Sequence, residues 1–150
     1  METFNLGQLT KEMVASRLRE MEDPCAVAAR ILEDALTSAL RNAKGFGPGE
    51  KEMVSEACHG AMIGILLRHQ DLSHGAVQVL RAACAAAQAL SLDPTEFMTL
   101  AIEGLARIRN VAPPEQLHEM IYALEAEFMG AGEVFRELCQ APVSPKIAGP

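Results

Sequence analysis

The sequence predicts an all-α protein, a single compact domain of six to seven helices packed as an orthogonal or irregular helical bundle. Ala and Leu dominate the apolar residues, which make up 49% of the chain, whereas aromatic residues reach only 4%. Ala and Leu favour helices, and the strand formers Val, Ile and Thr are too sparse and scattered for a sheet. Apolar residues also recur every three to four positions, in segments separated by Pro and Gly. A chain of 150 residues has the size of one domain and can bury a sizeable core.

The first expected helix covers about residues 6–21. Its apolar side chains, spaced three to five residues apart, are Leu6, Leu9, Met13, Leu18 and Met21. Asp23 and Pro24 follow directly. Asp caps helix N termini and Pro favours the first helical position, so this pair predicts the end of one helix and the beginning of the next.

The second expected helix covers about residues 24–43 and is amphipathic. Its apolar face consists of Ala28, Ile31, Leu32, Ala35, Leu36, Ala39, Leu40 and Ala43. A glycine-rich loop, residues 44–49, comes next. No strand precedes this loop and no Gly-Lys-Ser/Thr follows it, so the pattern indicates a helix end and a turn rather than a phosphate-binding loop.

The third and fourth expected helices cover about residues 50–69 and 74–91. The third is apolar around its circumference over residues 61–67, which is typical of a central helix or an interface. The fourth contains a run of small residues at 82–87. We expect this small surface to pack against Gly60 and Gly64 of the third helix, because mid-helix glycines are destabilising unless another backbone comes close.

The fifth, sixth and seventh expected helices cover about residues 94–109, 114–129 and 132–139. Asp93, Pro94 and Glu96 supply a cap, a first-turn Pro and a capping-box Glu for the fifth helix. The short seventh helix is expected to cover the others as a lid. The domain should therefore span residues 1–140, with residues 141–150 as a disordered C-terminal tail.

The charge and composition exclude several classes of function. The formal net charge is −7 and no basic cluster exceeds two neighbouring residues, so binding to nucleic acid or to an anionic membrane is not expected. The sequence has neither the pattern of a signal peptide nor an apolar run long enough to cross a bilayer. Its four cysteines are far apart, without a Cys-x-x-Cys pair. We therefore expect reduced thiols in an acidic cytoplasmic protein, and no zinc site built from cysteines alone.

Two Glu-x-x-His pairs are the most specific sign of metal chemistry. They are Glu56 with His59 on the third helix, and Glu115 with His118 on the sixth. In ferritin-like bundles two such pairs, together with one Glu from each of two other helices, hold two iron or two manganese ions. Glu33 and Glu103 could supply the remaining carboxylates.

The positions of these residues favour a simpler interpretation. Glu56 and His59 fall roughly opposite the apolar stripe of their helix, and Glu115 lies in a first turn, where the helix dipole alone favours a carboxylate. We therefore expect the four residues to be exposed side chains, and we keep the di-iron or di-manganese site as the alternative. His69 and His74 flank a turn, and a helix end and a cap explain them locally.

No arrangement of residues resembles a catalytic site, so the sequence predicts neither catalytic residues nor a cofactor. The expected function is a non-enzymatic module for protein–protein interaction or self-association, most simply a two-fold homodimer. The expected dimer surface is formed by Ile63 and Leu67 of the third helix and by Val79 and Ala86 of the fourth. These residues point away from the main apolar stripes. The alternative is a helical bundle that binds a metal or a small molecule through its carboxylates and histidines.

Overall fold

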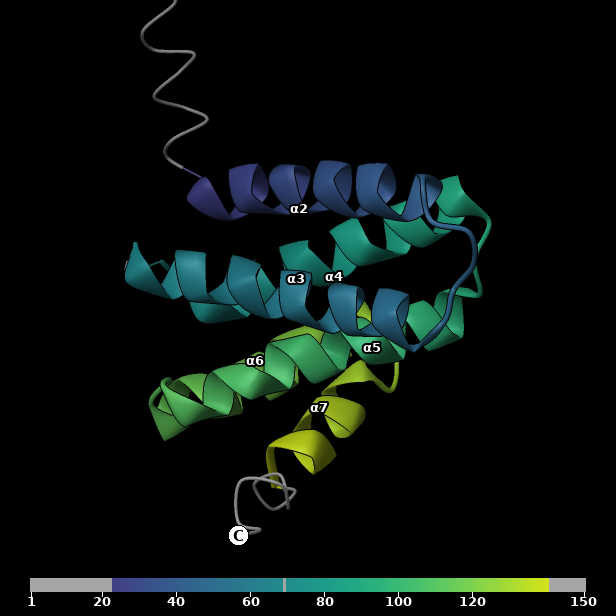
Figure 1. The fold of residues 1–150 in the computed structure, drawn as a ribbon. Coiled ribbons are helices and arrows are strands. Elements are labelled where there is room, and N and C mark those ends of the chain that lie inside the picture. The colour runs from purple at the N-terminus through teal and green to yellow at the C-terminus, as the bar shows by residue number, and fades with distance from the viewer. Residues whose placement is uncertain (1–22, 69, 141–150) are drawn as a thin grey trace, which may run out of the picture.

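The computed structural model describes residues 23–68 and 70–140, and it confirms the all-α class. In this part of the chain there are six α-helices, one short 3-10 helix and no strand (Figure 1). The elements are α2 (Pro24–Arg41), α3 (Pro48–Leu67), α4 (Leu72–Leu90), α5 (Pro94–Ala106), η1 (Arg107–Asn110), α6 (Pro114–Glu127) and α7 (Ala131–Gln140). The expected helix at 6–21, the expected tail at 141–150 and His69 lie outside the described residues.

Carboxylate caps and prolines set where the helices begin. The Asp23 carboxylate accepts a hydrogen bond from the Ala26 amide at 3.2 Å, and Asp93 caps α5 in the same way through the amide of Thr95. Both caps confirm the sequence prediction. The start of α4 was predicted two residues too late, because its cap is Asp71: the Asp71 carboxylate accepts a hydrogen bond from the Ser73 amide at 2.9 Å.

Helix α4 is the centre of the bundle. It packs against α2, α3, α5 and α6, whereas α7 packs on α5 and α6 at one end. In Figure 1, α2 lies at the top of the molecule and α7 at the bottom, with the other helices between them. Ten of the nineteen residues of α4 are buried, and six of these ten are Ala or Gly, so neighbouring helices can approach it closely on several sides.

The core is apolar, and no polar or charged residue among those described is buried as a whole. The largest side chains in it are Phe97, Phe135, Met62, Ile65, Leu72, Leu80, Leu105, Ile108, Met120 and Leu124. Val79 and Ala86, expected on a dimer surface, are fully buried within this core. That part of the expectation is wrong, because α4 is surrounded by its own chain.

Helices α3 and α5 come into close backbone contact at Gly104, whereas the predicted glycine pair makes no such contact. A Cβ added to Gly104 would lie 2.2 Å from the Ser55 carbonyl oxygen, so the backbones of α5 and α3 are in direct contact there. Gly60 and Gly64 are exposed, and an added Cβ would meet nothing within 4 Å. The prediction failed because the buried side of α3 runs through Cys58 and Met62. Each glycine follows one of these by two residues, about 200° around the helix.

None of the described helices combines the length and the apolar character that crossing a bilayer would require.

Candidate functional site

The four predicted metal ligands do not converge. Glu56 is exposed and His59 half-buried on α3, whereas Glu115 and His118 are exposed on α6. Helix α3 packs on α2, α4 and α5, and α6 packs on α4 and α7. Among the described residues, no three of these four side chains bring their ligand atoms within 4.8 Å of one another.

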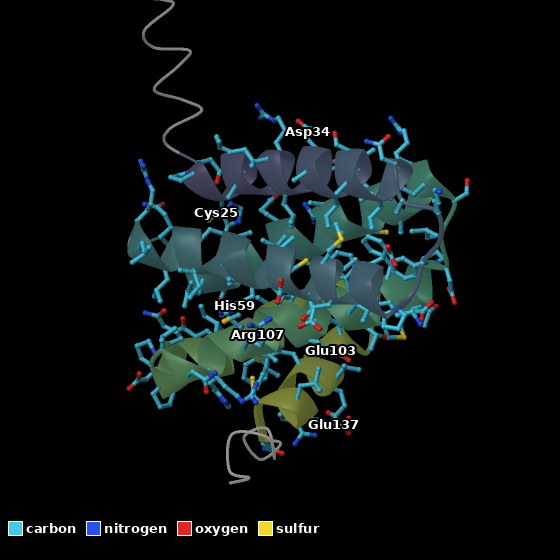
Figure 2. The ribbon with its side chains drawn as sticks, viewed as in Figure 1. Cys25, Asp34, His59, Glu103, Arg107 and Glu137 are labelled. Atoms are coloured by element: carbon cyan, nitrogen blue, oxygen red, sulfur yellow. The ribbon has the colours of Figure 1, made fainter. Side chains whose placement is uncertain are left out.

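His59 is less exposed than its position in the sequence indicated. His59 lies at the contact of α3 with α5, where a Cβ added to Gly104 would be 3.1 Å from its amide nitrogen. Its ring Nδ1 is buried without a hydrogen-bond partner among the described residues. Burial lowers the pKa of His59 from its usual value of 6.5, and the positive charge of Arg107 lowers it further, although the backbone of Gly104 acts in the opposite direction. Figure 2 shows His59 and Arg107 close together at this crossing. The surroundings of the imidazole therefore favour its neutral form.

One exposed ridge follows α3 for most of its length. Glu56, Gly60, Gly64 and Arg68 are spaced four residues apart, and all four are exposed. Residues at this spacing form one of the ridges through which helices pack on each other. Beside the ridge, the Leu67 side chain is 72% exposed. We call Glu56, Gly60, Gly64 and Arg68 the α3 ridge.

An apolar groove lies next to the α3 ridge, between α3 and the first half of α2. Its volume is about 310 Å³, and it is lined by Pro24, Val27, Ala28, Ile31, Gly64, Ile65 and Arg68. The Ile31 side chain at its edge is 64% exposed. In contrast, Asp34 projects from the outer face of α2 (Figure 2). The groove and the ridge together form a largely apolar surface with charged residues at its ends.

A second cluster joins the beginnings of α2 and α4. The ligand atoms of Asp23, Cys25 and His74 all lie within 4.8 Å of one another, and this is the only group of three or more His, Cys, Asp or Glu side chains that meets this criterion in residues 23–68 and 70–140. His74 Nε2 lies 3.1 Å from Asp23 Oδ1. The Cys25 thiol points toward the Asp71 carbonyl oxygen, at 3.8 Å.

The thiol in this cluster is not an activated nucleophile. Burial raises the pKa of Cys25 to about 11, and the carboxylates of Asp23 and Asp71 contribute to the increase. Cys25 is only 2% exposed, whereas the side chains of Asp23 and His74 are 45% and 44% exposed. A catalytic cysteine needs a lowered pKa and access to its substrate, and Cys25 has neither.

Sequence reasoning missed this cluster because each member had a local explanation. Asp23 caps α2, Cys25 is one of four scattered cysteines, and His74 lies in the first turn of α4. The cluster depends on the packing of α2 against α4, which brings residues about fifty positions apart into contact. No motif in either segment encodes that packing.

Comparison with known proteins adds no further constraint, since the chain matches no protein-family model, no curated protein and no solved structure.

Proposed function

We propose that the protein is a non-enzymatic helical module that self-associates as a two-fold homodimer through the α3 ridge. The observation that carries this proposal is the exposure of Gly60 and Gly64. A mid-helix Gly destabilises a helix by about 1 kcal/mol relative to Ala. Nothing in the described part of the chain packs on these two glycines to offset that loss. A second helix lying directly on them would do so.

The α3 ridge is complementary to a second copy of itself. Two α3 helices can be paired antiparallel with the two-fold axis at the level of Met62 along the helix. Gly60 of one copy then faces Gly64 of the other, because both lie two residues from this level. Glu56 and Arg68 both lie six residues from the same level, so each carboxylate faces a guanidinium of the partner helix. Neither side chain has a salt-bridge partner among the residues that the structure describes. The charges thus favour a like helix in this orientation.

Apolar side chains beside the ridge would extend the contact. Leu67 and Ile31 are both exposed, and the groove between α2 and α3 can accept side chains from a neighbouring surface. Two helices that pack through ridges of four-residue spacing cross at about −50°, which keeps the contact compact around the glycines. A stable dimer buries roughly 800 Å² on each partner, so the flanking α2 surface has to contribute as well.

Light scattering after size-exclusion chromatography tests the proposal on the full chain at tens of micromolar. We expect the mass of a dimer for the wild type and the mass of a monomer for Gly64→Leu, because the Leu side chain prevents close contact of the two helices. Within the monomer the position is open, so Gly64→Leu should not lower the free energy of unfolding. Gly49→Leu is the matched control. It is an open glycine in the first turn of the same helix, outside the ridge, and should remain dimeric.

The charge pairs provide a second test. Glu56→Arg and Arg68→Glu should each weaken the dimer, because they place like charges opposite each other, and the double variant should restore it. A wild-type chain that is a strict monomer at this concentration would contradict the proposal. So would a Gly64→Leu variant that is strongly destabilised as a monomer, since its own chain would then cover the ridge.

A further inference from the structure

We propose that Asp23, Cys25 and His74 form a binding site for Zn²⁺ where the first turns of α2 and α4 meet. This site is distinct from the α3 ridge, and none of the residues suggested by the Glu-x-x-His pairs belongs to it. Two backbone segments hold the cluster. Asp23 and Cys25 belong to the capped beginning of α2, and His74 belongs to the capped first turn of α4.

The types of ligand and their spacing suit zinc. Zinc binds thiolate, imidazole and carboxylate at about 2.0–2.3 Å, so its ligands in a tetrahedral site lie about 3.3–3.8 Å apart. The three ligand atoms here already lie within 4.8 Å of one another, and the pair formed by His74 and Asp23 is at 3.1 Å. The upper limit of 4.8 Å exceeds the tetrahedral range by only about 1 Å, a difference on the scale of small side-chain movements. Magnesium and calcium prefer oxygen ligands, so sulfur and nitrogen in this set favour zinc.

The electrostatic surroundings favour a cation bound to this thiol. Burial disfavours a thiolate at Cys25 while no cation is present, and the carboxylates of Asp23 and Asp71 make the potential there negative. A divalent ion reverses that balance, since a metal-bound thiol loses its proton at neutral pH. The partial positive charges at the beginnings of α2 and α4 also favour an ionised thiolate and carboxylate.

Binding can be written as a balanced exchange. The Cys25 thiol gives its proton to water as the sulfur–zinc bond forms. Neutral His74 binds through Nε2, which now faces Asp23, in the tautomer that carries the ring proton on Nδ1. Zinc enters from the side of Asp23 and His74, whose side chains are about half exposed, and reaches the buried sulfur beneath them. Figure 2 shows Cys25 on the inner side of α2. Three protein ligands leave the fourth position for water.

Metal titration of the full chain tests the site. Protein purified without chelators should bind one Zn²⁺ per chain in competition with a chromophoric chelator. Co²⁺, used as a spectroscopic substitute, should give the visible bands of tetrahedral cobalt and a thiolate-to-cobalt charge-transfer band. His74→Gln and Asp23→Asn should each weaken Zn²⁺ binding by at least about tenfold. Asn also caps helices, so the second variant keeps α2 intact.

The controls separate loss of a ligand from loss of the fold. Cys25→Ser should abolish the charge-transfer band, and circular dichroism establishes that each variant is folded. His118→Gln and Cys84→Ser alter an exposed histidine and a half-buried cysteine elsewhere, and should bind Zn²⁺ as the wild type does. Absence of stoichiometric binding, or binding that persists in folded His74→Gln and Asp23→Asn, would overturn the proposal. Neither result depends on whether the protein dimerises.

Discussion

At Gly104, the distance between two helices is set by main-chain atoms. The nearest neighbours of an added Cβ would be the Ser55 carbonyl oxygen, the Cys58 Cβ and the His59 amide nitrogen, all of which belong to α3. Two of these three atoms are backbone, so they cannot move by a change of rotamer. Gly104 thus permits the contact on which burial of Cys58 and partial burial of His59 depend.

We expect Gly104→Ala to lower the free energy of unfolding by about 1–3 kcal/mol, the range for overpacking a buried position. Gly60→Ala is the matched variant at an exposed mid-helix glycine. It should raise the free energy of unfolding by about 0.5–1 kcal/mol, because Ala is the better helix former and the site is open. Urea unfolding measures the free energy of unfolding of both variants, at a protein concentration low enough that self-association does not contribute. Equal effects of the two substitutions would contradict the assigned crossing.

The lowered pKa of His59 predicts a pH dependence of stability. The unfolded chain binds a proton near pH 6.5, whereas the folded chain resists protonation because the ring is partly buried and close to Arg107. This contribution to stability is therefore complete above pH 6.5 and is lost as the pH falls through the lowered pKa of the folded state.

Urea midpoints measured on both sides of pH 6.5 should show a smaller loss of stability on acidification for His59→Gln than for the wild type. The control is His118→Gln, which replaces an exposed histidine on α6 and should keep the full dependence. If both variants behave like the wild type, His59 is not the group that titrates.

Among the elements, the two helices that begin with an Asp-Pro pair were predicted correctly at their first residue. Asp23 with Pro24, and Asp93 with Pro94, fixed the beginnings of α2 and α5 to the residue. The role of Glu96 differed from the prediction, because its carboxylate forms an ion pair with Lys51 of α3 at 2.8 Å instead of completing a capping box. Such a contact depends on how α5 packs against α3, and no local pattern carries that information.

The turn between α6 and α7 depends on one carboxylate. Glu125 accepts hydrogen bonds from the amides of Gly130 and Gly132, at 2.9 and 3.0 Å. Gly130 has a φ of +89°, in the region that favours glycine, and an added Cβ at Gly132 would lie 2.4 Å from the Ile121 carbonyl oxygen. The hydrogen bond from Gly130 is the largest cause of the lowered pKa of Glu125.

We expect Glu125→Ala to loosen α7 while leaving α2 and α3 unchanged. Hydrogen exchange followed by mass spectrometry should show severalfold faster exchange over residues 131–140, because the turn that positions this helix loses its acceptor. Glu119→Ala, an exposed Glu on the same helix without this role, is the control. In the wild type the same protection should decline at acidic pH, since a lowered carboxyl pKa stabilises the fold only above it. Unchanged exchange in Glu125→Ala would show that packing alone holds the turn.

At the scale of the whole molecule, the class of the fold could be predicted and the arrangement of its helices could not. The spacing of apolar residues and the Pro, Gly and capping residues between segments predict where each helix lies, because both are local properties of the chain. Which face of α3 is buried was misjudged, since its second half is apolar on all sides and offers little amphipathic contrast. The structure resolves the ambiguity: Val54, Cys58, Met62 and Ile65 point inward, and the glycines point outward.

The candidate sites also differ in whether local sequence or helix packing brings their residues together. The α3 ridge consists of residues on one helix, so its members could be identified in the sequence, although the exposure of its two glycines could not. The cluster of Asp23, Cys25 and His74 exists only because α2 packs on α4, and it required the structure. The Glu-x-x-His pairs have a local pattern, but the helices that carry them do not bring them together.

The contact at Gly104 also limits which substitutions the chain can accept during evolution. Since main-chain atoms fix this crossing, the aliphatic residues around it can be exchanged over evolution without separating the helices. Substitution at position 104, or at the equally tight Gly132, would force a rearrangement. Among relatives that keep this fold, Gly104 and Gly132 should therefore be conserved longer than the aliphatic residues around them.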